Sequence, residues 1–161
     1  MTTRTDILLA IDPGLNGAYA TLGFTRGNFL GADELPRWEK SLDANKFGKF
    51  LRDLCPNQVV IERVHSMPKQ GVASSFTFGM AYGIVIGIVC GAGLPIAYVT
   101  PQKWKSHFRL IGAGKSSSVQ RVIEIYPDAA SSLTLKKHHG RADAILLARY
   151  FLDATRKGEF V

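Results

Sequence analysis

The chain has 161 residues, a net charge of +7 and two cysteines. Its length predicts one domain, residues 1–161, with a full hydrophobic core, and its composition excludes collagen-like, disulfide-rich and intrinsically disordered proteins. Cys55 and Cys90 are not spaced as metal ligands, and we expect both to be reduced, buried thiols of an intracellular protein. The N-terminal sequence MTTRTDILLAIDPG has too short an apolar run for a secretory signal, which favours a cytoplasmic location.

The positive charge is concentrated in the middle of the chain. No aspartate or glutamate occurs between Glu62 and Glu124, whereas the same stretch holds seven basic residues, which equals the whole net charge. A block of one sign is typical of proteins that bind a polyanion, with nucleic acid the first candidate, although a sparse solvated surface would give the same pattern. The basic residues are Arg63, Lys69, Lys103, Lys105, Arg109, Lys115 and Arg121.

Two segments consist of an apolar strand followed directly by a carboxylate. ILLAI, residues 7–11, is suited to a strand buried on both faces, and it ends at Asp12. Pro13 and Gly14 then turn the chain, so Asp12 taken alone is interpreted first as a turn residue and second as a reactive one. QVVI, residues 58–61, repeats the arrangement and ends at Glu62.

The segments between these two strands complete the first half of the pattern. Residues 17–24 and 29–33 predict strands that form an antiparallel meander with the first strand. Residues 43–54 predict an amphipathic helix. The apolar face of this helix comprises Phe47, Phe50, Leu51 and Leu54.

The longest predicted helix, residues 74–91, has a glycine at every fourth position. Each glycine inside a helix costs about 1 kcal/mol relative to alanine, so the stripe needs a reason, and we interpret it as a surface that another backbone approaches closely. A membrane span is the alternative, because no charged residue occurs between positions 70 and 102. The short continuous apolar run and the nearby Pro95 argue against a span. The stripe comprises Gly79, Gly83, Gly87 and Gly91.

The C-terminal half alternates a strand with helices. Residues 94–99 predict a strand, residues 101–108 a short helix, and residues 115–126 a clearer helix with a serine-rich start. The last helix runs from residue 140 or 141 to 154, with Ala144, Leu147, Ala148 and Phe151 on its buried side. The whole order predicts an α/β fold with a mixed five-stranded sheet, an antiparallel meander plus two parallel strands, and flanking helices.

Three carboxylates are expected to meet at one edge of this sheet. If the strands that end at Asp12 and Glu62 are parallel neighbours, both side chains project into the crevice where α/β sheets place their ligands. Asp143, in the first turns of the last helix, belongs with them. Three carboxylates in one crevice raise one another's pKa unless a cation lies between them, and Mg²⁺ or Mn²⁺ is suited to this role.

The sequence IGAGKSSS resembles a nucleotide-binding P-loop only superficially. That motif requires glycine where the chain has Arg109, and it follows a strand, which this segment does not. We therefore expect no nucleotide cofactor. Residues 112–118 are interpreted as a flexible basic loop that enters a helix, with amide groups and Lys115 available to hold a DNA phosphate.

The motifs IDPGLNGAYA, VVIERVHS and HHGRADAILLARY, in this order, resemble the RuvC-type Holliday junction resolvases of bacteria and phages. The resemblance covers residues 7 to about 154. It implies a ribonuclease H-like fold, a homodimer, and Mg²⁺-dependent cutting of four-way DNA junctions in the cytoplasm of a bacterial or phage-infected cell. It also implies two Mg²⁺ ions per site, for which Mn²⁺ can substitute.

The resemblance assigns catalytic and metal-binding roles to the three acids. Asp12 matches the first-strand aspartate that bridges the two metal ions, Glu62 the glutamate that ends the fourth strand, and Asp143 the final aspartate on the C-terminal helix. A further ligand of the family lies three residues before that aspartate, where this chain has Gly140. His139, one residue earlier, is the alternative ligand. The other interpretation of His139 is a solvent-exposed histidine that binds no metal. His138 is a weaker candidate for the ligand.

Further residues match positions that contact DNA in the family. Lys105 and Lys115 match catalytic basic residues near the scissile phosphate. His65 falls where some members carry an aromatic wedge that enters the junction. Phe76 or Met67 is a possible substitute for this wedge, although Phe76 is more readily expected in the core.

The resulting prediction is a metal-dependent endonuclease whose two-fold dimer makes paired nicks in four-way DNA junctions. Two alternatives remain open: a nuclease that cuts flaps and forks more generally, and a non-catalytic module that binds junctions. A third, an ATP-binding relative of actin and the sugar kinases, shares the turn after the first strand, but the chain is too short for its doubled domain.

Overall fold

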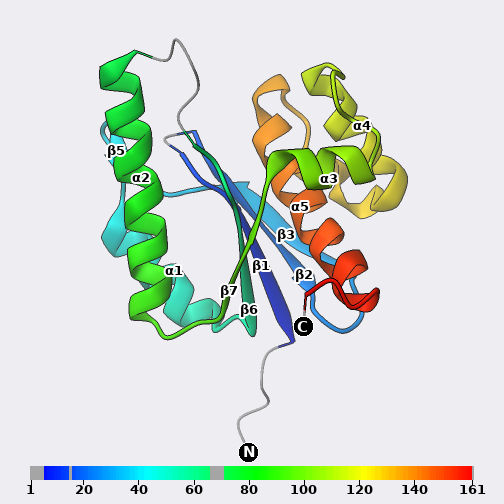
Figure 1. The fold of residues 1–161 in the computed structure, drawn as a ribbon, viewed down its shortest axis with the longest axis horizontal. Helices are drawn as coiled ribbons and strands as arrows, with labels where there is room; N and C mark the ends of the chain where they lie inside the picture. The colour runs from blue at the N-terminus through cyan, green and yellow to red at the C-terminus, as the bar shows by residue number, and fades with distance from the viewer. Residues whose placement is uncertain (1–5, 15, 66–70, 161) are drawn as a thin grey trace, which may run out of the picture.

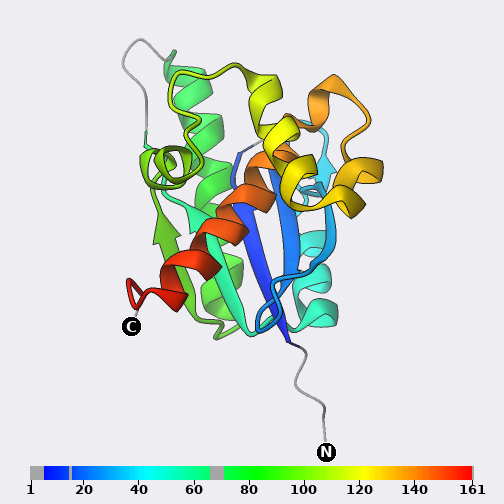
Figure 2. The ribbon, with the colours of Figure 1, turned by 90° about the vertical axis from the view of Figure 1, so that its right-hand side faces the viewer.

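The structure is a computed structural model that describes residues 6–14, 16–65 and 71–160. A mixed five-stranded sheet lies at its centre, with helices on both faces (Figures 1 and 2). The strands stand in the order β3-β2-β1-β6-β7. They comprise β1 (Ile7–Asp12), β2 (Ala18–Gly23), β3 (Phe29–Glu34), β6 (Gln58–Glu62) and β7 (Ile96–Val99).

The strand directions are those predicted from the sequence. β1 pairs antiparallel with β2, and β2 with β3, which forms the meander. β1 pairs parallel with β6, and β6 with β7. The α/β fold with a mixed five-stranded sheet is therefore confirmed.

The helices form two layers, one on each face of the sheet (Figure 1). One layer contains α1 (Ala44–Leu54) and α2 (Val72–Gly91). The other contains α3 (Pro101–His107), α4 (Lys115–Ile125) and α5 (His139–Arg156), with the 3-10 segments η1 (Pro127–Ser132) and η2 (Lys136–His138). A small hairpin of β4 (Arg37–Trp38) and β5 (Ser41–Leu42) precedes α1. The hairpin and the two 3-10 segments were not predicted from the sequence.

The alternation of side chains along β1 divides the core into two parts. Leu8 and Ala10 pack with the α5 layer, whereas Leu9 and Ile11 pack with the α1–α2 layer. All four are fully buried, which explains why the strand is apolar throughout rather than alternating with polar residues. The predicted buried face of α5, including Ala144, Leu147, Ala148 and Phe151, is confirmed.

Helix α2 is buried on one side only. Ala81, Val85 and Val89 face the sheet, whereas the four glycines of the stripe are exposed. Phe76 is 69% exposed, so the core position expected for it is wrong. By length and composition alone, α2 is the one helix among the described residues that could cross a membrane, which is weak evidence for a span.

The cysteines also differ from the prediction. Cys55 and Cys90 are both exposed rather than buried. Cys55 is the C-cap of α1 in a left-handed conformation, and Cys90 lies on the outer side of the last turn of α2. Both lie at helix ends, where the chain leaves the packed layer.

Candidate functional site

The parallel pairing of β1 and β6 brings Asp12 and Glu62 together. Ile11 stands opposite Ile61 in the register of the two strands, and each acid is the next residue along its strand. The two carboxyl groups share a hydrogen bond. The convergence predicted from the repeated strand-then-acid pattern is therefore observed.

The turn after Asp12 is held tight by a glycine. A Cβ atom at Gly17 would lie 2.5 Å from the carbonyl oxygen of Asp12 and 2.8 Å from the side chain of Leu35. Any larger residue would push the turn away from the end of β1. Gly17 therefore allows the turn to pack closely against the backbone at the end of β1.

Asp143 reaches the same site from α5, which packs across β1 and β2. Its charge acts on both Asp12 and Glu62 and raises the pKa of each. The Ser118 hydroxyl of α4 forms a hydrogen bond with the Asp143 side chain. Three residues far apart in the chain thus share one electrostatic environment.

The side chains of Asp12, Glu62 and Asp143 all have a pKa above the ordinary value for their residue type. Burial is the largest cause in each case, because it penalises the charged carboxylate. For Asp12 the pKa is raised well above 3.8, and the neighbouring charges of Glu62 and Asp143 add to the effect of burial. A site of this kind holds negative charge that the protein alone does not neutralise.

Lys105 is the cation that partly offsets this charge. It lowers the pKa of Asp12, Glu62 and Asp143. Its Nζ atom lies 5.3 Å from the centre of the Trp104 ring, a cation–π contact that directs the side chain. The position predicted for Lys105, near the reacting phosphate, agrees with this placement beside the acids.

Two residues that orient the carboxylates were missed by the sequence reasoning. The Trp104 Nε1 atom donates a hydrogen bond of 2.7 Å to Oε1 of Glu62, and its ring is 1% exposed. Ser118, also buried, holds Asp143. Both hydrogen bonds lower the pKa of their acceptor, opposing burial. Their only sequence signals were a tryptophan beside Lys105 and the serine-rich start of α4.

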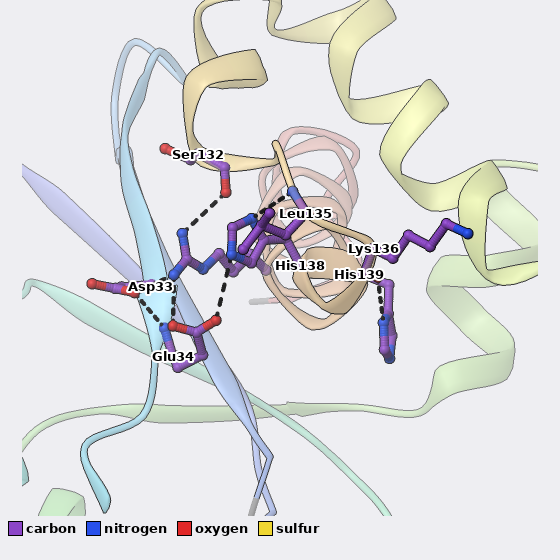
Figure 3. Close-up of polar contacts among 8 residues, drawn as sticks. Asp33, Glu34, Ser132, Leu135, Lys136, His138 and His139 are labelled. Carbon is purple, nitrogen blue, oxygen red and sulfur yellow. Dashed lines mark hydrogen bonds and ion pairs between the residues drawn. The ribbon is translucent and has the colours of Figure 1, made fainter.

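The two histidines before Asp143 occupy different environments (Figure 3). His138 is buried, its Nδ1 accepts a hydrogen bond of 3.2 Å from the Leu135 amide, and its Nε2 lies 3.8 Å from Glu34. His139 begins α5 one helical turn before Asp143, whose pKa it lowers. Its Nδ1 lies 3.3 Å from the Lys136 carbonyl oxygen, so of the two histidines His139 is the one that acts electrostatically on Asp143, without a contact to the acid.

Arg141 fastens the first turn of α5 to the end of β3. Its Nη2 donates to Asp33 at 2.7 Å and to Glu34 at 2.6 Å, and its Nη1 donates to the Ser132 carbonyl at 3.1 Å. The hydrogen bond from Arg141 lowers the pKa of Glu34. This network, drawn in Figure 3, fixes the helix that carries Asp143.

Gly140, where the family carries a ligand, faces the turn after β1. A Cβ atom at this position would lie 3.6 Å from Ala18 and 3.7 Å from the Asn16 carbonyl, which are ordinary contact distances. A Cβ atom would therefore fit at position 140, so a lack of space does not explain why the chain has glycine where the family has a metal ligand.

The predicted DNA-contacting residues are mostly exposed around the site. Arg63, His65, Lys103, Arg109 and Lys115 are exposed. Arg121 forms an ion pair of 3.0 Å with Glu124, which neutralises part of its charge. Lys69 and Met67 lie outside the described residues.

Two cavities open beside the carboxylates. One, of about 600 Å³, has Asp12 in its lining together with Asn16, Lys40 and Thr77. The other, of about 500 Å³, is lined by His65, Lys105 and Gly112 among others. Phe78 of α2 lines both. Phe78 therefore lies between the cavity that contains Asp12 and the cavity that contains Lys105.

The carboxylates of Asp12, Glu62 and Asp143 are suitable ligands for a hard divalent cation, although they are not arranged as a complete coordination site. Among residues 6–14, 16–65 and 71–160, no group of three His, Cys, Asp or Glu side chains is arranged to hold a metal ion. The acids that interact are all oxygen donors, Glu62 buried and Asp12 and Asp143 half-buried. Burial raises the pKa of all three, and repulsion from neighbouring acids adds to this for Asp12 and Glu62. Carboxylate oxygens are the ligands that Mg²⁺ and Mn²⁺ prefer, and a cation between them would remove this repulsion. The three acids therefore have the ligand chemistry that Mg²⁺ or Mn²⁺ requires.

The sequence resembles that of a chloroplast protein over part of its length. A segment of 89 residues, 55% of this chain, is 33% identical to the chloroplastic Holliday junction resolvase MOC1 of Chlamydomonas reinhardtii. The chain spans 10% of the length of that protein. No family model matches the sequence.

Solved structures share the fold over almost the whole chain. Thermus thermophilus RuvC in complex with a Holliday junction substrate has a TM-score of 0.67 at 20% identity, covering 94% of this chain and 96% of that one. The yeast mitochondrial Holliday junction resolvase Ydc2 has a TM-score of 0.67 at 12% identity, covering 96% and 82%. The fowlpox virus resolvase has a TM-score of 0.58 at 15% identity, covering 92% and 99%. The chain therefore has the ribonuclease H-like fold of the RuvC-type Holliday junction resolvases, as its sequence motifs predict.

Proposed function

We propose that this chain is a metal-dependent endonuclease that cuts four-way DNA junctions by phosphodiester hydrolysis. The observation that carries the proposal is the gathering of Asp12, Glu62 and Asp143 around Lys105, beside open cavities, on this fold. The names of the matched proteins, which are Holliday junction resolvases, supply the substrate.

The proposed cofactor is two Mg²⁺ ions per site, with Mn²⁺ as a substitute. Asp12, Glu62 and Asp143 would hold the ions, with His139 as the remaining ligand. When bound, such ions would lower the pKa of the attacking water and stabilise the negative charge on the leaving oxygen. Lys105 and Lys115 offset the charge of the phosphate as the bond breaks. The exposed basic residues bind backbone phosphates, so binding should weaken steeply with salt.

The test is cleavage of a labelled four-way junction with and without Mg²⁺, comparing the native protein with Asp12→Asn. Four-way, three-way and linear duplex DNA are cut in parallel. Cleavage of the four-way junction alone supports the proposal, and equal cleavage of three-way DNA supports the broader branched-DNA nuclease. Tight junction binding without cutting, unaffected by Asp12→Asn, supports the non-catalytic module.

We further propose that the outer face of α2 forms the interface of a two-fold homodimer. The glycine stripe is exposed, and a Cβ atom at Gly79, Gly83, Gly87 or Gly91 would meet no atom within 4 Å. The exposed Phe76 and Met80 continue this face toward the N-terminus of the helix. A two-fold dimer would present two equivalent sites to the two equivalent strands of a junction.

Gly83→Leu is expected to convert the dimer into monomers without unfolding the chain. The new side chain has space within one subunit, whereas it would block close approach of a second helix. Light scattering measures the mass, and circular dichroism monitors the fold. Gly83→Ala, which adds one methyl group, should cause a smaller shift. A folded, fully dimeric Gly83→Leu protein would contradict the interface.

Trp104→Phe is expected to weaken metal binding while keeping the ring buried. The change removes the 2.7 Å hydrogen bond that orients Glu62, and loss of such supporting contacts costs roughly 10- to 100-fold in metal affinity or activity. Calorimetric titration with Mn²⁺ measures the effect, with Trp38→Phe as the matched control because Trp38 is 67% exposed. Equal affinities for the two variants would refute the role of Trp104.

Cellular location stays a prediction from the N-terminal sequence. The expectation was the cytoplasm of a bacterial or phage-infected cell, whereas two of the matched proteins are named for a chloroplast and a mitochondrion.

A further inference from the structure

The hairpin of β4 and β5 stands beside the cavity that contains Asp12. Leu35, just before the hairpin, and Leu42, the last residue of β5, are buried in the core of the α1–α2 layer. The Asp43 amide donates to the Pro36 carbonyl at 2.9 Å, which closes the base. At the tip, Glu39 has a left-handed φ of 51°. A positive φ is the usual geometry of the two-residue turn that joins the strands of a hairpin.

The outer side chains of this hairpin have the chemistry of a nucleic-acid contact. Trp38 is 67% exposed, whereas the other tryptophan, Trp104, is 1% exposed. Arg37 and Lys40 are exposed, and within the described part of the chain neither forms an ion pair with an acid. An exposed aromatic ring between two cations provides a stacking face and phosphate contacts together.

The hairpin also forms one wall of the cavity that contains Asp12. Lys40 lines this cavity of about 600 Å³, and Thr77 and Phe78 of α2 line it as well. The Arg37 guanidinium donates a 2.9 Å hydrogen bond to Oδ1 of Asn16, which belongs to the same lining. β5 lies against α2 (Figure 1), which lines the same cavity, so this packing keeps the hairpin next to the cavity that contains Asp12.

We propose that this hairpin binds a DNA strand as it leaves the carboxylate site, with Trp38 stacking on a base and Lys40 and Arg37 contacting phosphates. The inference rests on the proposed function, because it names a further part of the surface that holds the same substrate. These residues lie outside the basic block at positions 62–124, so the charge distribution along the chain did not identify them.

The experiment measures binding of a fluorescein-labelled four-way junction in chelator, so that no cleavage occurs. Trp38→Ala should weaken binding about tenfold, as expected for loss of one stacking contact. Trp38→Phe, which keeps an aromatic face, should bind nearly as the native protein, and Trp38→Leu should resemble alanine. Lys40→Ala should weaken binding and reduce the salt slope by about one. Lys157→Ala, the same charge change on an exposed residue at the far end of α5, is the control.

A second readout uses the two tryptophans of the chain. Trp104 is 1% exposed, so acrylamide quenching of the free protein should come from Trp38, and bound DNA should protect it. Unchanged quenching together with native affinity of Trp38→Ala and Lys40→Ala would overturn the hairpin contact while leaving the proposed function standing. Failure of the native protein to bind junctions at all would overturn both.

Discussion

Asp12→Asn should make the metal-free protein more stable while abolishing its metal-dependent cleavage. The Asp12 carboxylate is buried beside Glu62 and Asp143, so its pKa is raised and its charged form destabilises the fold. An amide keeps the shape and removes the charge. Relief of one buried, uncompensated charge is worth on the order of 2 kcal/mol, which corresponds to a rise in Tm of roughly 4–8 °C for a domain of this size.

The pH dependence of this effect has a defined sign. In the unfolded chain Asp12 titrates near its ordinary pKa of 3.8, whereas in the folded protein its pKa is higher. Between the two values the folded protein binds more protons, so stability falls as the pH rises through this window and stays low above it. Asp12→Asn should flatten this fall. Calorimetry in chelator from about pH 4 to about pH 8 measures it.

Added Mg²⁺ or Mn²⁺ should stabilise the native protein above this window and should stabilise Asp12→Asn less, because a ligand has been lost. Ser118→Ala is a useful comparison, since it keeps all three acids and removes only the hydrogen bond to Asp143. An Asp12→Asn protein that is less stable than native in chelator, or that still cuts DNA, would contradict the proposed site.

Lys105→Met should lower the rate of cleavage by about 10²- to 10³-fold, the usual cost of removing one group that stabilises developing charge. Lys105 interacts electrostatically with all three acids and lines the cavity of about 500 Å³. Methionine keeps the length of the side chain and loses only the charge. Single-turnover cleavage at saturating protein separates this rate effect from binding.

Lys103→Met is the matched control for this change. Lys103 lies two residues earlier in α3, is exposed, and is not among the charges that shift the pKa of any of the three acids. It should weaken DNA binding with a reduction of about one in the salt slope, and leave the single-turnover rate nearly unchanged. Since Lys105 offsets the same charge that a metal would, its loss should not weaken metal binding. Equal rates for the two variants would contradict a catalytic role for Lys105.

The sequence by itself determined the sheet and the meeting of the main carboxylates. Apolar runs that end in Asp12 and Glu62 are typical of strands buried on both faces. The parallel pairing, a condition of the prediction, is the one observed, and it brings their carboxyl ends to one edge. The periodicity of the last helix likewise determined its buried face. These features depend on local patterns repeated along the backbone.

Only the tertiary structure decided which side chains support the site. Trp104 meets Glu62 across 42 residues of sequence, and Arg141 meets Glu34 across 107, so neither contact leaves a local pattern. Helix α2 is apolar on all sides, and periodicity therefore gave no means of choosing its buried face or of placing Phe76 outside. The short hairpin that carries Trp38 is positioned by packing at its base. Contacts between distant segments form only when the layers pack, and for this reason the sequence alone located the acids but not the residues that hold them.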